Sequence, residues 1–368
     1  MNNDNSVIYG LESQARALAP QLAETEKIKF LIGTQSLKQT TNQIHLVEFN
    51  EELSTIKTSV FHHTDGEIWK LTTSLLDPLK LATCYNVVIN DNSCIFKTAI
   101  LKLPEEENLE TIENLEILTS FDTVEYGTDI KTTEFHPTDG CKAASVIDNH
   151  VVLWDISESE GRKVMSVQLD GKNNPKFTTG KWNPHQNCNQ FSTATDTNVK
   201  TYDIRTGDLA WTIEGAHTQL LRDMDYNMNK QYHIATCGDD GFVKIWDFRQ
   251  PSQAVYARNE HSHWVWCVRF NHFHDQLLLT SSSDARVLLS SAASVSSENT
   301  NESCSDENKG VETKQLLSDG TLQWCEHEDS VYCAEWSPSE PWVFASLSYD
   351  GRLLISRVKR SLKYQIML

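Results

Sequence analysis

The chain has 368 residues, of which 39% are hydrophobic and 23% are charged, so it can bury a large core. Its formal net charge of −19 disfavours binding to nucleic acids and to anionic membranes, because both require a basic surface. The chain has no run of ~20 apolar residues that could span a bilayer, no signal-peptide pattern in 1–20 and no CxxC pair among its nine Cys. We therefore predict a cytoplasmic protein with reduced thiols.

Short apolar segments in the first hundred residues indicate strands. Segment 7–11 has the length and composition of a single strand. Segments 43–47 and 98–101 resemble the third strands of a four-stranded repeat unit, although neither carries a Trp-Asp ending. An insertion at 104–116 then holds six Glu and no basic residue, before a fourth strand near 115–119. This composition is too polar to fold alone, so we predict an acidic loop.

The clearest repeat unit, 217–247, contains four residues that are expected to form a hydrogen-bonded network. A buried Trp246 indole N–H requires an acceptor, which the Thr236 hydroxyl can provide. That hydroxyl can also bond to His217, while Asp240 accepts a hydrogen bond from His217 and organises the turn before the third strand. We therefore predict a structural tetrad of His217, Thr236, Asp240 and Trp246.

The spacing of this unit recurs along the chain. The interval of 23 residues between the His and the turn Asp of 217–247 is repeated twice, from His261 and from His327. In each of five units, the turn Asp precedes the Trp position by six residues. Besides Asp240, the turn Asp residues are Asp148, Asp196, Asp284 and Asp350. The Trp positions form the series 47, 101, 154, 202, 246, 290 and 356.

Seven units of this kind predict a closed ring. A WD repeat has a period of ~40–45 residues, so the longer steps in the series must hold insertions. A four-stranded sheet cannot bury both of its faces alone, but sheets stacked around an axis can. The sequence thus predicts an all-β fold: a seven-bladed WD-repeat β-propeller with four-stranded antiparallel blades. We expect one domain over 1–368, with acidic loop insertions at 104–116 and 291–320.

The second insertion, 291–320, is rich in Ser and Asn and holds six acidic residues and two Lys. Both insertions connect a third strand to a fourth strand, so both should emerge on the same face of the ring. Ser303 and Ser305 precede Asp306 and Glu307, a pattern that would suit phosphorylation by an acid-directed kinase. The alternative is that both insertions are passive, solvated loops.

The sequence leaves the closure of the ring open. One blade must share strands from both ends of the chain. Segment 7–11 is the candidate for an N-terminal closing strand, and segment 364–368 competes for that role.

An alignment of the units places one residue of each inner strand near the mouth of the central channel. This mouth should open on the face opposite the acidic insertions. The aligned residues are Trp69, Lys131, Arg222, Trp266 and Tyr332, and Trp264 and Tyr349 lie in neighbouring loops. Trp, Tyr and Arg dominate protein-binding hot spots. We therefore predict these seven as partner-binding residues; the alternative is that the aromatic side chains only pack between blades.

Catalytic and metal-binding patterns are absent from the sequence. The pairs His261/His263 and His272/His274 have no further ligand at a recognisable spacing, and the repeat already assigns a role to His261. No GxSxG, P-loop or GxGxxG string occurs. We predict a protein that is not an enzyme and that has no metal or cofactor.

Several strings go beyond a generic WD repeat. They are VIYGLE (7–12), QARAL (14–18), FLIGTQSLK (30–38), NQIH (42–45), GEIW (66–69), EHSHWVW (260–266), DQLLLT (275–280) and ASLSYDGRL (345–353). Together they resemble the EARP-interacting protein family over essentially the whole chain. The resemblance implies a scaffold that binds subunits of the EARP and GARP tethering complexes, in endosomal recycling, retrograde transport to the trans-Golgi network and dense-core vesicle maturation. It implies a peripheral location at those membranes through partners, and a monomer outside its complexes.

Two alternative functions remain open at this point. Trp246-Asp247-Phe248-Arg249 and Tyr202-Asp203-Ile204-Arg205 fit the W/Y-D-x-R pattern of substrate receptors of cullin-RING ubiquitin ligases, although such an Arg can also form a local ion pair. A reader of modified peptides would instead need Trp69, Trp266 and Tyr332 to converge within ~6 Å of a bound cation.

Overall fold

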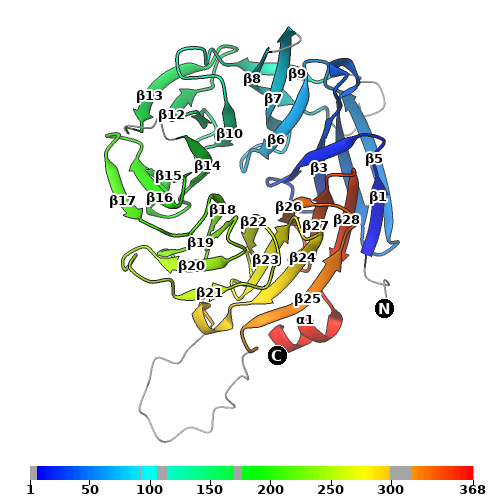
Figure 1. The fold of residues 1–368 in the computed structure, drawn as a ribbon. Helices are drawn as coiled ribbons and strands as arrows, with labels where there is room; N and C mark the ends of the chain where they lie inside the picture. Colours follow the sequence, from blue (N-terminus) through cyan, green and yellow to red (C-terminus); the bar gives the residue numbers. More distant parts are fainter. Residues whose placement is uncertain (1–5, 91–92, 106–113, 170–175, 299–316, 368) are drawn as a thin grey trace, which may run out of the picture.

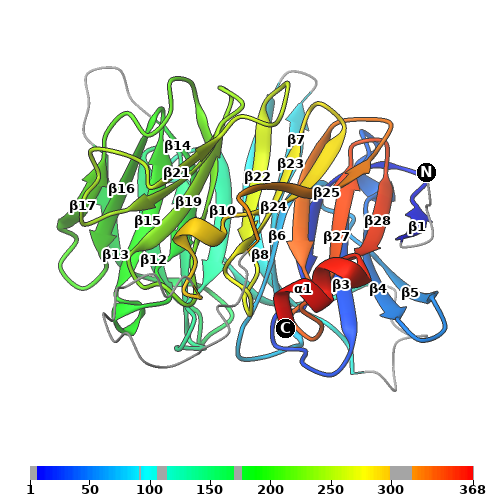
Figure 2. The same cartoon turned by 90° about the horizontal axis from the view of Figure 1, so that it is seen from below.

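The computed structural model describes residues 6–90, 93–105, 114–169, 176–298 and 317–367. These residues form seven four-stranded antiparallel sheets that are arranged as blades around a central axis (Figure 1). The prediction of a seven-bladed β-propeller is therefore confirmed. Figure 2 shows the same ring from the side.

The first three blades follow one another along the chain. Blade one contains β2 (Gln14–Pro20), β3 (Ile28–Gln35), β4 (Gln43–Asn50) and β5 (Thr55–His62). Blade two contains β6 (Glu67–Thr73), β7 (Lys80–Asn90), β8 (Ser93–Lys102) and β9 (Glu116–Ser120). Blade three contains β10 (Ile130–Phe135), β11 (Lys142–Ile147), β12 (His150–Asp155) and β13 (Arg162–Gln168).

The remaining blades repeat this order. Blade four contains β14 (Phe177–Trp182), β15 (Gln190–Thr195), β16 (Asn198–Asp203) and β17 (Leu209–Ile213). Blade five contains β18 (Leu221–Tyr226), β19 (His233–Gly238), β20 (Val243–Asp247) and β21 (Tyr256–Arg258). Blade six contains β22 (Val265–Phe270), β23 (Leu277–Ser282), β24 (Arg286–Ser291) and β25 (Gly320–Glu326). Blade seven contains β26 (Val331–Trp336), β27 (Val343–Ser348), β28 (Arg352–Arg357) and β1 (Ser6–Gly10), and α1 (Arg360–Met367) follows it.

The N-terminal strand closes the ring. β1 pairs antiparallel with β28, and Val7 lies opposite Ile355. Val7 packs on a cluster that combines residues of blades seven and one, including Phe30 and Leu353. The candidate strand at 7–11 is thus confirmed with bounds shifted by one residue, whereas the competing strand at 364–368 is wrong.

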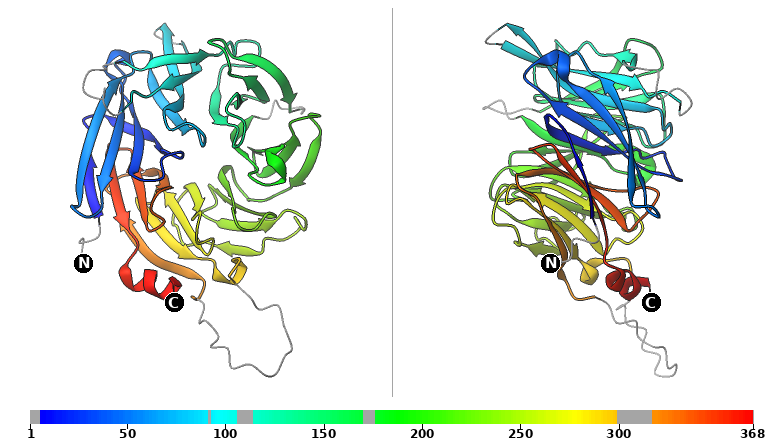
Figure 3. Two further views of the ribbon diagram at one scale, coloured as in Figure 1. Left: turned by 180° about the vertical axis from the view of Figure 1, so that it is seen from behind. Right: turned by 90° about the vertical axis from the view of Figure 1, so that its right-hand side faces the viewer.

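The C-terminal segment is helical because it covers the rim of the propeller. Ile366 of α1 is buried in a cluster with Leu277 of blade six, Phe344 of blade seven and Trp342, which lies in the loop between β26 and β27. Figures 1 and 3 show α1 outside the ring, beside β25. Within the described ranges no helix is long and apolar enough to cross a membrane.

The core lies between the blades. The second strands β3, β23 and β27 are buried at every residue, because each strand is covered by neighbouring blades on both faces. Each apolar cluster combines residues of adjacent blades; one joins Val146 of blade three to Phe191 of blade four. All seven positions of the predicted Trp series fall in third strands.

The turns before the third strands have two geometries, which the constant offset of six residues conceals. Asp148 and Asp196 open tight two-residue turns and themselves adopt positive φ angles of 45° and 54°. Asp240 lies in a longer turn, in which the next residue, Gly241, takes the positive φ of 76°. Asp tolerates this left-handed backbone better than most residues, which explains its presence in the tight turns.

Both acidic insertions connect third strands to fourth strands, as expected from the sequence. They run from β8 to β9 and from β24 to β25. Most of each insertion, including Ser303 and Ser305, lies outside the described residues. In each sheet of this topology, the inner strand begins at the face opposite to the end of the third strand. The channel mouth at the start of the inner strands is therefore on the face away from the two insertions.

Closure by β1 predicts a face-dependent effect of a charge in that strand. Replacement Val7→Asp should lower the free energy of unfolding by about 1–3 kcal/mol, because it places a carboxylate in the partly buried, apolar seam between the ends of the chain. The matched replacement Ile8→Asp, on the 62% exposed side of the strand, should cost less than about 0.5 kcal/mol. Urea denaturation measures both, and equal losses would contradict the role of β1 as the closing strand.

Candidate functional site

A hydrogen-bonded corner stabilises blade five. Trp246 Nε1 donates to Thr236 Oγ1 at 3.0 Å, and His217 Nε2 lies 2.9 Å from the same oxygen. His217 Nδ1 lies 2.8 Å from Asp240 Oδ1, and the backbone N–H of Thr218 donates to Asp240 Oδ2 at 2.9 Å. Burial alone would raise the pKa of Asp240, but the hydrogen bonds with His217 and Thr218 help to hold this pKa well below its ordinary value. The four predicted tetrad residues therefore form one connected network.

The corners of blades six and seven keep part of this network. His261 bridges Thr280 Oγ1 at 2.9 Å and Asp284 Oδ2 at 3.0 Å. Burial alone would raise the pKa of Asp284, but the hydrogen bond with His261 outweighs burial and helps to lower this pKa to about 2. In blade seven, His327 lies 2.9 Å from Ser348 Oγ, and Ser348 in turn donates to Asp350 at 2.5 Å. The turn Asp of that blade thus reaches its His through a serine.

The tight corner of blade three is built differently. Asp148 accepts a hydrogen bond from the backbone N–H of Thr128 at 2.8 Å and forms an ion pair with Lys176 of the following segment at 2.5 Å. Trp154 fills the Trp position there, but its buried indole N–H has no hydrogen-bond acceptor among the described residues. Asp196 contributes the backbone carbonyl that accepts from Leu221.

A β-bulge recurs at one position of every inner strand that the structure describes. In each pair of first and second strands, the register shifts at a single residue near the start of the inner strand. A bulge leaves the extra residue unpaired and re-aims its side chain. The seven bulge residues are Arg16, Trp69, Lys131, Thr178, Arg222, Trp266 and Tyr332. All seven line one cavity of about 510 Å³; we call this set the channel-mouth ring.

The predicted aromatic residues form a contiguous series at this ring. The rings of Trp266 and Tyr332 are 4.8 Å apart, and Trp266 also contacts Trp264 at 6.0 Å. Tyr349 extends the series, 5.7 Å from Tyr332. Trp264 is 41% exposed, so the series reaches the surface.

The two predicted basic residues of the ring already have acidic partners. Arg222 forms a two-bonded ion pair with Asp239, with distances of 2.6 and 2.7 Å, and its guanidinium lies 4.4 Å from the ring centre of Trp266. Lys131 lies 2.7 Å from Asp129. Both residues line the cavity as predicted, with their charges paired locally.

Sequence alignment missed Arg16 and Thr178. The guanidinium of Arg16 lies 5.0 Å from the ring centre of Trp69, 5.3 Å from that of Trp266 and 4.6 Å from that of Tyr332. The three aromatic residues therefore converge as a cation cage requires, but the cation inside it belongs to this chain. This arrangement removes the basis for a reader of modified lysine at this cage.

A layer of charged side chains lies below the ring. Arg269 forms ion pairs with Asp223 at 2.5 Å and with Glu335 at 2.8 Å. Although burial alone would lower the pKa of Lys70, the nearby carboxylates of Asp223 and Glu134 help to raise it. Charges of both signs thus neutralise one another in the buried part of the channel.

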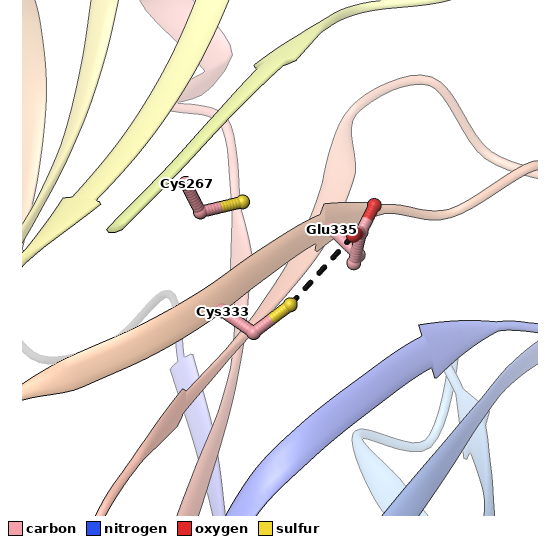
Figure 4. Close-up of side chains that lie close together, drawn as sticks. All are labelled: Cys267, Cys333 and Glu335. Carbon is pink, nitrogen blue, oxygen red and sulfur yellow. Dashed lines mark hydrogen bonds between the residues drawn. The ribbon is translucent and has the colours of Figure 1, made fainter. Parts of the chain in front are cut away.

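Two thiols and a carboxylate in this layer could be taken for metal ligands. Cys267, Cys333 and Glu335 present their ligand atoms within 4.8 Å of one another, and the Cys333 thiol donates to Glu335 at 3.7 Å (Figure 4). However, Arg269 already donates to the same oxygen of Glu335. A guanidinium beside this carboxylate repels a second cation. Burial raises the pKa of Cys267 well above its ordinary value, whereas the hydrogen bond with Cys267 lowers the pKa of Cys333, so only one of the two thiols is shifted toward the thiolate that a metal needs. The cluster therefore fits the charge layer better than a metal centre.

The W/Y-D-x-R arginines form local ion pairs. Arg249 donates twice to Asp247, at 3.0 and 2.6 Å, and Arg205 donates twice to Asp203, at 3.1 and 2.7 Å. These pairs account for both arginines without a ligase adaptor.

The fold and the ring of aromatic and basic side chains define a WD-repeat β-propeller of the kind that binds other proteins. A family model described as "EIPR1 beta-propeller" matches residues 3–290, and a model described as "WD domain, G-beta repeat" matches residues 320–355. The chain belongs to the EARP-interacting protein family.

Relatives from distant animals match along their whole length. The chain is 46% identical to the EARP and GARP complex-interacting protein 1 of Homo sapiens and to an EARP-interacting protein homolog of Gekko japonicus, with 100% of each chain covered. It is 35% identical to the EARP-interacting protein 1 of Caenorhabditis elegans, with 98% of each chain covered.

The corner of blade five predicts a specific dependence on one hydroxyl. Replacement Thr236→Val keeps the shape but leaves Trp246 Nε1 and His217 Nε2 without their shared partner, so it should lower the free energy of unfolding by about 2–4 kcal/mol. Replacement Thr236→Ser keeps the hydroxyl and should cost only about 1 kcal/mol. Denaturation curves compare the two; a loss for Thr236→Ser as large as that for Thr236→Val would show that packing, rather than the network, dominates.

The corner of blade seven predicts a loss of stability in mild acid. Burial lowers the pKa of His327 from 6.5 to about 4. The folded state therefore binds a proton at His327 less readily than the unfolded state does. The contribution of neutral His327 to stability is complete above pH 6.5 and is lost as the pH falls toward 4. Between pH 7 and pH 5, this residue should account for roughly 1–2 kcal/mol of lost stability.

The variant His327→Gln isolates this contribution. Burial lowers the pKa of His45 to about 4 as well, and His45 titrates equally in both proteins. Denaturation at the two pH values should therefore show a smaller loss for His327→Gln than for the unmodified chain. Identical losses would contradict the assignment.

Proposed function

We propose that this protein is a non-catalytic scaffold that binds subunits of the EARP and GARP tethering complexes at the channel-mouth ring. The names of its relatives, which refer to the EARP and GARP complexes, support the identity of the partners. By this proposal the protein is cytoplasmic and monomeric outside its complexes. It reaches endosomes and the trans-Golgi network through its partners and inserts into no membrane.

The observation that carries the proposed binding site is the recurrence of the bulge. Inner strands of all seven blades direct their bulge residues into one cavity, and six of the seven residues are aromatic or basic. Trp, Tyr and Arg combine a large contact area with hydrogen-bonding capacity, which explains their weight in protein interfaces. Two of the three basic residues, Arg222 and Lys131, are paired with Asp239 and Asp129, which leaves the positive charge of Arg16 at the mouth.

A pair of tryptophans on one blade tests this site. Trp266 lies in the inner strand of blade six and lines the mouth, whereas Trp324 lies in the outer strand of the same blade and is 61% exposed. Replacement Trp266→Ala should weaken recovery of tethering subunits at least tenfold in quantitative affinity purification, since a central aromatic residue contributes about 2 kcal/mol or more. Trp324→Ala should leave recovery unchanged.

Thermal unfolding confirms that both variants fold before they are compared. Equal recovery of the tethering subunits with folded Trp266→Ala and Trp324→Ala would place the interface elsewhere on the propeller. Failure of the unmodified chain to recover any tethering subunit would overturn the proposed partners themselves.

A further inference from the structure

We infer that Arg16 is a carboxylate receptor: an acidic side chain or a C-terminal carboxylate of the bound partner enters the channel mouth and pairs with its guanidinium. The inference rests on the proposed function, which supplies the partner. It adds the chemistry that the partner must present and the residue that recognises it.

Arg16 differs from the other arginines that line the cavity in having no acidic partner. Arg222 is bonded to Asp239, and Arg269 is bonded to Asp223 and Glu335. Within the described ranges of the chain, the Arg16 guanidinium forms no hydrogen bond and no ion pair. Its contacts are the three aromatic rings of the cage.

The aromatic cage partly shields the unpaired guanidinium of Arg16 from water. Burial lowers the pKa of Arg16 from its ordinary value, although the nearby Tyr332 acts in the opposite direction and favours the charged form. Partial removal of a charge from water has a cost, which pairing and hydrogen bonding offset. Aromatic rings stabilise the guanidinium through cation–π contacts but accept few of its five N–H groups. A carboxylate from a partner would supply the missing acceptors.

Hydrogen-bond donors exceed acceptors around Arg16. The Trp69 indole N–H is buried without an acceptor among the described residues. Lys70 lines the same cavity and forms no hydrogen bond with any residue in the described part of the chain. The nearby carboxylates Asp129 and Asp223 already bond to Lys131 and Arg269. The ligand that matches this wall of the cavity is therefore a group rich in hydrogen-bond acceptors, which can pair with the unsatisfied donors.

A carboxylate fits this wall better than a phosphate. A planar guanidinium matches a carboxylate through two parallel hydrogen bonds. The three rings around Arg16 restrain its orientation and so reduce the entropy lost when those bonds form. A phosphate can form the same two bonds but carries about twice the charge, so the single unpaired charge of Arg16 balances one carboxylate and leaves a phosphate with excess negative charge. We therefore assign the site to a partner segment with Asp, Glu or a free C-terminus.

The experiment uses the full chain, the purified tethering complexes and peptides tiled over their subunits. Binding of each complex is measured for the unmodified chain, Arg16→Gln and Arg16→Lys, with Arg162→Gln as the control. Arg162 is 80% exposed on the outer strand of blade three and is paired with Asp155, away from the mouth. Every peptide that binds is remade with Asn or Gln in place of its acids, with an amidated C-terminus, and with phosphoserine in place of one acid.

The expected result is a loss of at least tenfold in affinity for Arg16→Gln, because a charge-assisted pair contributes roughly that factor or more. Arg16→Lys should lose part of the affinity, since it keeps the charge but not the paired geometry. Arg162→Gln should bind like the unmodified chain. Neutralising the acids of a peptide should weaken its binding to the unmodified chain. The neutralised peptide should then bind Arg16→Gln about as weakly as it binds the unmodified chain.

Two outcomes would overturn the role of Arg16 as the receptor while leaving the proposed function intact. One is full binding of the complexes by folded Arg16→Gln. The other is full binding of the unmodified chain by neutralised peptides, a test that stands even if Arg16→Gln fails to fold. Tighter binding of the phosphoserine peptides than of their acidic parents would overturn the choice of a carboxylate. Absence of any binding by the unmodified chain would instead refute the proposed function, and the inference with it.

Discussion

Burial of the second strand of each blade on both faces is the constraint on which this structure depends. β3, β23 and β27 expose no residue, so none of the three would be stable without a blade on either side. A linear array would leave two such faces open at its ends. Pairing of β1 with β28 removes both ends at once, because it joins the first segment of the chain to the last blade. The Tyr9 hydroxyl, 2.9 Å from His45 Nδ1, links the closing strand to blade one as well.

The channel-mouth ring follows from this closed architecture. Seven inner strands run side by side around the axis, and one bulge near the start of each strand points a side chain toward the same space. A repeat unit whose strands and corners serve packing thereby also directs seven side chains into one cavity. The sequence at these positions is free to vary because the bulge residue forms no ladder hydrogen bonds. Arg16 and Trp266 can then serve recognition while the corners at His217 and His261 maintain the blades.

Much of this arrangement could be predicted from the sequence, because the corners need particular side chains at fixed intervals. The spacing from His217 to Asp240, and from Asp240 to Trp246, identified the repeat, and the outer-loop His then located Trp266 and Tyr332. Arg16 and Thr178 were missed because the alignment did not extend to blades one and four, although Thr178 precedes Asp196 by 18 residues, as Arg222 precedes Asp240. Divergence of the corner in blade three, where Asp148 pairs with Lys176, is likewise invisible to a spacing rule. The offset of six residues is the same in both turn geometries.

Other features depend on contacts between distant segments, which no local pattern encodes. The proximity of Cys267 to Cys333 and Glu335 arises only when blades six and seven pack at the axis. The choice between the two ends of the chain for ring closure is also a tertiary matter: segment 364–368 has the apolar residues of a strand but finds its burial site as a helix, through Ile366. In each case the competing structures satisfy the local preferences, and packing between blades decides the outcome.

The central claim is that partners bind where the inner strands begin. Oxidative footprinting of tryptophan tests it most directly, since Trp264 at the mouth and Trp324 on the outer edge of the same blade are 41% and 61% exposed. The account predicts that a bound tethering complex protects Trp264 from oxidation and leaves Trp324 unchanged. Protection of Trp324 with continued oxidation of Trp264 would contradict it.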